Sequence, residues 1–170
     1  LIEAGPRLLA GMSEESSAHA EQFLREMGVN ILLNKRVVDY RDHKVVLEDG
    51  TEIATRTFIW VSGVTGVTIG NLDASLIGRG GRIKVDSFNR VEGMNNVFAI
   101  GDQCIQLADE NYPNGHPQLA QVAIQQGELL AKNLIRMEKG QEMKPFHYRN
   151  LGSMATVGRN RAVAEFSKVK

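Results

Sequence analysis

The residues best suited to chemistry lie between positions 96 and 127. The apolar run 97–100 stops at Gly101 and Asp102, a pattern typical of a buried strand with a carboxylate at its carboxyl end. Open α/β sheets bind their ligands at that edge. Gly101 has no side chain, so a ligand can approach the backbone closely, and the Asp102 carboxylate can accept hydrogen bonds from a sugar or ribitol hydroxyl.

A helix is expected to begin at Pro117, shortly after the Gly-Asp pair. Proline suits the first helical position, because the N–H that it lacks would be unpaired there. The N–H groups of Gln118, Leu119 and Ala120 would then point out of the helix end, toward an electron-rich ring or an anion. A strand edge and a helix end in this order can hold both ends of an extended cofactor.

The same stretch resembles the C-terminal FAD-binding part of type II NADH dehydrogenases, the single-subunit NADH:quinone oxidoreductases of the two-dinucleotide-binding flavoprotein superfamily. Asp102 matches the aspartate of a Thr/Ala-x-Gly-Asp segment, which in that superfamily holds the ribitol or pyrophosphate region of FAD. The resemblance implies that the amides of Gln118, Leu119 and Ala120 meet the pyrimidine side of the flavin. It begins at Leu1 and covers nearly the whole chain.

A second segment narrows the resemblance to the quinone-reducing branch. Residues 120–125 read Ala-Gln-Val-Ala-Ile-Gln and match the Ala-Gln-x-Ala-x-Gln segment of that branch. The resemblance implies that Gln121 and Gln125 border the quinone pocket. Neutral amides suit this role, because they can bond a quinone carbonyl without placing a charge in an apolar slot. Gln126 is a third candidate, although a glutamine on a helix is usually solvated.

The resemblance implies an enzyme that uses FAD as cofactor and NADH as co-substrate, with hydride transfer to the flavin followed by two-electron reduction of a quinone. It also implies a possible homodimer that is peripheral to the cytoplasmic face of the inner membrane, docked by helices that in the family follow the position of Lys170. The chain opens mid-strand with Leu1 and contains neither glycine-rich dinucleotide turn. We therefore expect an excerpt of a longer protein that is inactive by itself.

Two residues are assigned to NADH on the same resemblance. Glu3 ends a short apolar strand, and in dinucleotide-binding units an acid at such a strand end bonds the adenosine ribose. Gly63 lies in a turn that in the family passes between the nicotinamide and FAD sites. Without the resemblance, Glu3 is an exposed acid and Gly63 belongs to an ordinary tight turn.

Composition argues against several other classes of function. Basic and acidic residues number 20 each, which gives no indication of nucleic-acid binding. Cys104 is the single cysteine, so the chain lacks an internal disulfide and the paired redox cysteines of disulfide reductases, and we expect a packed thiol. No pair among the histidines and Cys104 has metal-ligand spacing. His116, beside the helix start, is a better candidate for a proton relay than His147.

The expected fold is α/β: an incomplete pair of Rossmann-like dinucleotide-binding domains with small antiparallel β pieces. The resemblance divides it into the C-terminal half of an NADH-binding domain (1–63), an interdomain crossover (64–81) and the C-terminal part of an FAD-binding domain (82–170). Periodicity and turn residues predict helices at 13–27 and 117–138, strands at 29–33, 37–40, 45–47, 52–55, 57–62, 82–85 and 97–100, and a hairpin at 151–166. The resemblance implies that this hairpin supports the quinone side. The second helix is expected to bury Leu119, Val122, Ala123, Leu130 and Leu134.

Two other interpretations stay open. The first is another NADH-dependent flavoprotein reductase, of the ferredoxin-reductase type, and an acceptor screen would separate it from a quinone reductase. The second is a non-catalytic module for dimerisation or membrane docking, in which exposed sheet edges pair with a second copy. Light scattering with and without FAD would test that module.

Overall fold

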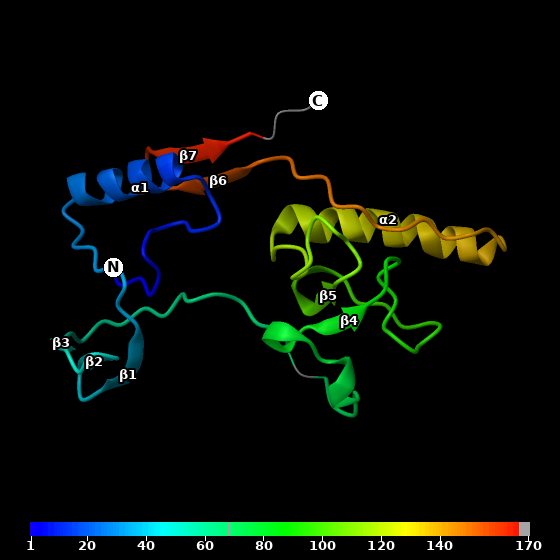
Figure 1. Ribbon diagram of the computed structural model, residues 1–170, viewed down its shortest axis with the longest axis horizontal. Coiled ribbons are helices and arrows are strands. Elements are labelled where there is room, and N and C mark those ends of the chain that lie inside the picture. The colour runs from blue at the N-terminus through cyan, green and yellow to red at the C-terminus, as the bar shows by residue number, and fades with distance from the viewer. Residues whose placement is uncertain (68, 167–170) are drawn as a thin grey trace. The chain divides into compact units, whose positions relative to one another are not determined.

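The computed structural model describes residues 1–67 and 69–166 and divides into two compact units (Figure 1). The first unit consists of residues 1–61 together with the C-terminal segment from Leu151, and the second of residues 62–150. This grouping differs from the predicted division at 63 and 82, because the C-terminal hairpin belongs with the first unit. None of the helices in the described ranges is both long enough and apolar enough to span a bilayer.

Helix α1, Glu14–Glu26, confirms the helix predicted at 13–27. The Ser13 hydroxyl caps it by accepting a hydrogen bond from the Ser16 N–H at 3.2 Å, and glutamates occupy its first turn, where the helix dipole favours negative charge. Gly28 follows the helix with φ +81°, a left-handed conformation that glycine adopts without strain. Local signals alone therefore fix both ends of this helix.

The apolar stripe of α1 packs against an antiparallel hairpin from the other end of the chain. The hairpin strands are β6, Ser153–Thr156, and β7, Ala162–Glu165, and α1 lies alongside them (Figure 1). Ala20, Val157 and Val163 form the buried cluster between helix and hairpin. The hairpin is confirmed, while its predicted support of the quinone side stays a prediction, because these contacts are with α1.

The rest of the first unit is built from short β elements. Ile2 and Leu32 form an isolated parallel bridge, so the chain returns beside its N-terminal segment after α1, but the regular strand predicted at 29–33 is not formed. A separate antiparallel sheet has the order β1–β2–β3, and its strands span Val37–Arg41, Lys44–Leu47 and Glu52–Ala54. These strands confirm the predicted antiparallel piece, and Gly50 makes the expected turn with φ +83°.

The prediction of a buried strand at 57–62 is wrong. No strand pairing is found for this stretch within the described residues, and Ile59, Trp60 and Val61 are 76%, 59% and 85% exposed. An apolar run becomes a buried strand only where a neighbouring strand supplies hydrogen bonds and a second layer covers it. The part of the chain that the structure describes supplies neither at this place.

The second unit is centred on two parallel strands, β4, Ile83–Val85, and β5, Cys104–Gln106. Its buried cluster consists of Ile83, Val85, Val91, Ala99 and Cys104. β4 confirms the strand predicted at 82–85. β5 is an element that the sequence pattern did not indicate, and it places Cys104 in the core, as expected for a packed thiol.

The prediction of a regular strand at 97–100 is wrong, because the run forms only an isolated bridge. Arg90 and Phe98 make an isolated antiparallel bridge, supported by the bond from the Ala99 N–H to the Asn89 carbonyl at 3.0 Å. The regular strand follows the Gly-Asp turn instead of preceding it. Residues 89–91 lie beside this run and form hydrogen bonds with its backbone, so the run is paired although it does not belong to a longer β-ladder.

Helix α2, Ala120–Glu138, begins at Ala120 rather than at Pro117 and ends near Gly140, as predicted. Its buried residues are Val122, Gln126 and Asn133. Leu119 and Leu134 of the predicted apolar face are 40% and 47% exposed. That part of the prediction is wrong, because two amide side chains occupy the buried side and hold backbone groups of neighbouring segments.

Candidate functional site

The Gly-Asp pair forms a short 3₁₀ turn, Gly101–Gln103, that packs against the first turns of α2. Gly101 has φ +65°, and a Cβ added there would lie 3.2 Å from the Cβ of Ala123. Both observations favour glycine, since the backbone is left-handed and the helix approaches closely. Gln118 donates from Nε2 to the Asp102 carbonyl at 3.2 Å. The structure thus brings the predicted turn and the predicted helix start together.

Gln126 joins the same turn to α2 from inside the core. Its Oε1 accepts the Gly101 N–H at 2.7 Å, its Nε2 lies 3.5 Å from the Cys104 Sγ, and the residue is 1% exposed. Burial raises the pKa of the Cys104 thiol, so this sulfur is a packed thiol and not a thiolate. Sequence reasoning did not give Gln126 this role, although its position one helical turn after Val122 places it on the buried face.

The start of α2 carries no side-chain cap. Leu119 is the N-cap residue in an extended conformation, with φ −130° and ψ 144°, and its own N–H donates to the Pro117 carbonyl at 3.0 Å. Of the predicted helix-end donors, Leu119 is therefore engaged locally, and the helix itself begins at Ala120. Uncapped N–H groups in a first helical turn attract electron-rich or anionic groups.

The two predicted quinone residues have different surroundings. Gln121 is half-buried in the first turn of α2. Gln125 is tied to the backbone of Arg149: its Oε1 accepts the Arg149 N–H at 3.0 Å and its Nε2 donates to the Arg149 carbonyl at 2.9 Å. Contact of Gln125 with a quinone stays a prediction, and it would require the amide to share or release these two bonds.

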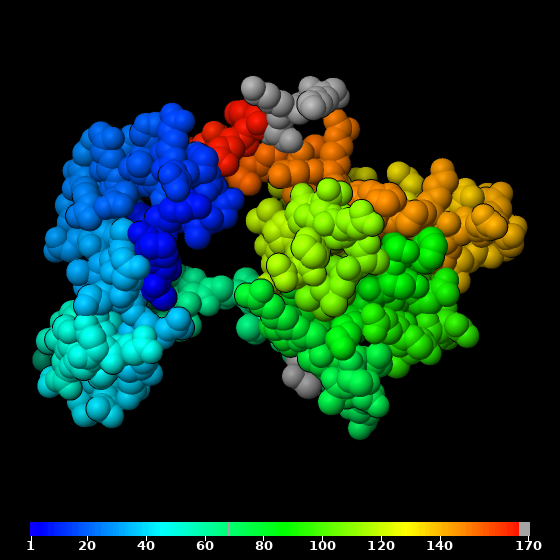
Figure 2. All heavy atoms as spheres, in the orientation of Figure 1, coloured from blue at the N-terminus to red at the C-terminus, as the bar shows by residue number. Residues whose placement is uncertain are grey.

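The loop between β5 and α2 contains a buried histidine–aspartate pair, and Figure 2 shows this yellow-green loop on the face turned to the viewer. His116 Nε2 lies 2.9 Å from Asp109 Oδ2, and the side chains are 4% and 8% exposed. The bond to His116 holds the pKa of Asp109 below its usual range. Burial raises the pKa of Tyr112 and of Tyr148, whose rings lie near the imidazole. The proton-relay role of His116 stays a prediction.

The two predicted NADH residues fall in different units. Glu3 lies in the first unit, where its Oε1 accepts the Gly5 N–H at 2.7 Å, so that the carboxylate closes the turn after the strand end. Gly63 lies in the second unit and has φ +87°, a conformation that favours glycine. Both residues occupy turns of the expected kind, and their contact with NADH stays a prediction.

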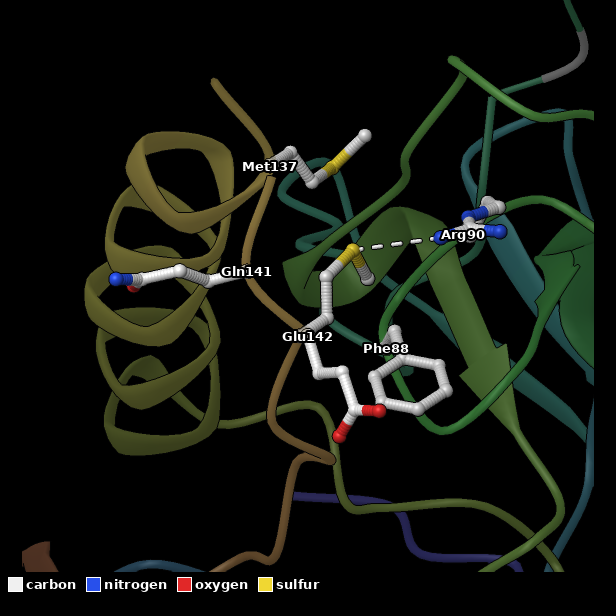
Figure 3. Close-up of a pocket in the computed structure, with 6 residues that line it drawn as sticks. Phe88, Arg90, Met137, Gln141 and Glu142 are labelled. Atoms are coloured by element: carbon white, nitrogen blue, oxygen red, sulfur yellow. Dashed lines mark hydrogen bonds between the residues drawn. The ribbon is translucent and has the colours of Figure 1, made fainter. Parts of the chain in front are cut away.

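A separate pocket of about 530 Å³ lies near the C-terminal end of α2 (Figure 3). It is lined by Phe88, Arg90, Met137, Gln141, Glu142 and Met143. Arg90 donates from Nη2 to the Met143 sulfur at 3.3 Å, the contact drawn as a dashed line in Figure 3. None of the predicted site residues lines this pocket, and the Gly-Asp turn packs near the opposite end of α2.

Comparison with known proteins agrees with these features. The sequence pattern of the pyridine nucleotide-disulphide oxidoreductase family matches residues 1–127. The type II NADH:quinone oxidoreductase NdhA of Mycobacterium tuberculosis is 34% identical over 183 residues, which cover 100% of this chain and 37% of that protein. A type II NADH:quinone oxidoreductase of Staphylococcus aureus is 32% identical over 161 residues, 92% of this chain and 39% of that protein.

Solved structures show the same fold. NDH2 of Plasmodium falciparum in complex with NADH superposes with a TM-score of 0.81 at 18% identity, over 99% of this chain and 50% of that chain. Reduced CoADR-RHD of Bacillus anthracis gives 0.69 at 21% identity, over 93% of this chain and 28% of that chain. The predicted α/β class is therefore confirmed, and the chain spans a little over a third of the length of the curated relatives it matches.

The predicted resemblance to type II NADH dehydrogenases is confirmed by the relatives that the chain matches. The family pattern runs from Leu1 through Gly127 and so includes both the Gly-Asp turn and the glutamines of α2. On this match, which covers well over half of its length, the chain belongs to the pyridine nucleotide-disulphide oxidoreductase family.

Proposed function

We propose that the chain is part of an FAD-dependent enzyme that takes a hydride from NADH and passes two electrons to a quinone. FAD, when bound, supplies the hydride-accepting chemistry that protein side chains lack. The contact between the Gly101–Gln103 turn and the uncapped start of α2 is the observation that supports this most directly. The names of the curated relatives support the choice of NADH and quinone as substrates.

The residues at the turn fit a flavin nucleotide. Gly101 allows α2 to pack closely against the turn, because a side chain there would meet Ala123, and the neighbouring Asp102 is exposed. In this proposal the Asp102 carboxylate accepts hydrogen bonds from the ribitol or pyrophosphate region, which fixes the position of the cofactor relative to the helix. Gln118 steadies the acceptor by holding the Asp102 carbonyl.

The start of α2 fits the electron-rich edge of the same cofactor. The N–H of Ala120 and the positive end of the helix dipole lie next to the turn, and they favour negative charge on the group that they face. Gln121, in the same first helical turn, is proposed to bond a quinone carbonyl. Cys104 takes no redox part here, because it is buried and its pKa is raised.

The remaining assignments belong to the same proposal. Glu3 bonds the adenosine ribose of NADH, and Gly63 lets the backbone pass close to the nicotinamide. The whole protein is a peripheral enzyme of the cytoplasmic face of the inner membrane and can form a homodimer, and the chain alone is inactive. Another NADH-dependent flavoprotein reductase is the alternative, and the choice of electron acceptor distinguishes the two.

The test uses the whole protein that contains this chain. Asp102→Ala is expected to lose bound FAD, measured by the flavin absorbance per protein after gel filtration, whereas Asp73→Ala, which removes an exposed acid from another turn of the same unit, is expected to keep it. Gln121→Leu is expected to raise the quinone KM and to leave NADH oxidation by ferricyanide unchanged. Stoichiometric flavin in Asp102→Ala would contradict the role of that carboxylate, and equal loss of both activities in Gln121→Leu would contradict a quinone contact.

A further inference from the structure

We propose that Gln126 is a positioning residue of the flavin site: its buried amide holds the Gly101 N–H and thereby fixes the turn that presents Asp102. This inference rests on the proposed function, because the turn matters for catalysis only if Asp102 holds FAD. Gln126 itself is 1% exposed, so it acts on the cofactor through the turn and not by contact.

Gln126 lies where α2 packs closely against the Gly-Asp turn. Its Oε1 lies 2.7 Å from the Gly101 nitrogen. The same face of α2 brings Ala123 to 3.2 Å from the Cβ position of Gly101, and a Cβ at Gly127 would lie 3.8 Å from the Cδ1 of Ile100. Residues before, at and after the turn are thus in contact with one helix face, and Gln126 supplies the polar contact.

The position of this hydrogen bond in the chain allows it to fix the backbone conformation that places Asp102. Gln126 holds the N–H of Gly101, the residue before Asp102. Gln118 holds the carbonyl of Asp102 itself. The Gly101 N–H is partly buried, and such an N–H without an acceptor is unfavourable, so a chain that loses Oε1 turns this amide toward another acceptor or toward water. Because Gly101 is glycine at φ +65°, the backbone is free to make that rotation. Asp102 would rotate with it.

A second buried amide on α2 provides a matched control. Asn133 lies two helical turns after Gln126 on the same face and is also 1% exposed. It accepts the Lys144 N–H and donates to the Lys144 carbonyl, both at 2.8 Å. Loss of this amide removes buried hydrogen bonds of the same chemical kind, but at a place remote in sequence from the Gly-Asp turn.

The experiment compares three variants of the whole protein by FAD titration after the flavin has been removed, and by urea unfolding. Gln126→Met removes the acceptor at similar volume and is expected to raise the FAD Kd about tenfold or more. Gln126→Glu keeps an acceptor oxygen but buries a carboxyl, so its FAD Kd is expected to lie between those of wild type and Gln126→Met. Asn133→Leu is expected to lower the urea midpoint and to leave the FAD Kd unchanged.

The outcomes separate this inference from the proposed function. Wild-type affinity in Gln126→Met would overturn the inference, and so would an equal rise in Kd for Asn133→Leu, since that result would show a general loss of stability. A wild-type protein that binds no FAD would overturn the proposed function itself. A rise in Kd for Gln126→Met but not for Asn133→Leu, with partial recovery in Gln126→Glu, would support both.

Discussion

Replacement of His116 by leucine is expected to loosen the loop that leads into α2. His116 Nε2 lies 2.9 Å from Asp109 Oδ2 across the loop, and the Asp109 side chain is 8% exposed. A polar group left buried without such a partner costs about 1–3 kcal/mol, and a charged group costs more. Asp109 keeps the Asn111 N–H, which donates to Oδ1 at 3.0 Å, so we expect about 2 kcal/mol of lost loop stability.

Hydrogen exchange of the peptide spanning 107–119 measures this loss directly. A decrease of about 2 kcal/mol in the free energy of opening corresponds to about 30-fold faster exchange of the amides that the loop protects. Tyr112 and Gly115 carry two of these amides, which donate to the carbonyls of Asp109 and Tyr112. His147→Leu, the same substitution at an exposed histidine, serves as the control and is expected to change little.

The effect should also depend on pH in a definite direction. The bond to His116 lowers the pKa of Asp109 in the folded state, so the carboxylate stabilises the fold above its unfolded pKa of about 3.9. This stabilisation is lost as the pH falls through the folded value, and the difference between wild type and His116→Leu should shrink below about pH 4. Exchange that is equally fast in His147→Leu, or a difference that grows in acid, would refute the assignment.

Three further changes test other parts of the structure. Gly115→Ala should lower the unfolding free energy by well over the ~1 kcal/mol of a strained turn, because Gly115 has φ +85° and an added Cβ would lie 2.6 Å from Ile105. Gly140→Ala is the control: Gly140 has φ +66° and nothing lies within 4 Å of its added Cβ, so this variant should lose only ~1 kcal/mol. Urea unfolding of both variants measures the difference. Ile59→Thr and Val61→Thr should change the unfolding free energy by less than about 0.5 kcal/mol, since these side chains are 76% and 85% exposed, and a larger loss would mean that the stretch is packed. Glu165→Gln should weaken the docking of α1 at pH 7, because hydrogen bonds from the side chains of Ser13 and Ser16 and from the Ser13 N–H lower the pKa of the Glu165 carboxylate. This difference from wild type should shrink progressively as the pH falls below about 4, and circular dichroism at a series of pH values measures it.

Features set by local chemistry could be predicted from the sequence. Ser13 as a cap and Gly28 as a stop define α1, and Asp49-Gly50 defines a hairpin, because each residue type favours its own backbone conformation. The meeting of Gly101 with the start of α2 could also be predicted, from a family resemblance together with the general position of ligands at strand ends. In these cases a few neighbouring residues carry the whole signal.

Features that depend on distant partners could not be predicted. The apolar runs at 57–62 and 97–100 look alike in sequence, yet the first is exposed and the second is paired by residues 89–91. The hairpin at 151–166 gives no sign that α1 will be its partner. Apolar periodicity indicates which side chains favour burial, but it does not indicate which element will cover them.

Amide side chains of α2 bond backbone groups of the irregular segments beside the helix; Gln126 and Asn133 are buried and Gln125 is half-buried. Gln125 and Asn133 each bond both the N–H and the carbonyl of one residue, Arg149 and Lys144. A carboxamide presents a donor and an acceptor side by side, as a peptide group in a neighbouring strand does. The helix thereby takes the place of a strand for these two segments, and Gln126 supplies only the acceptor, to the Gly101 N–H. Leucines in place of Gln126 and Asn133 would remove the partners of the partly buried Gly101 and Lys144 peptide groups, so completing the apolar face at these two positions is expected to lower the stability.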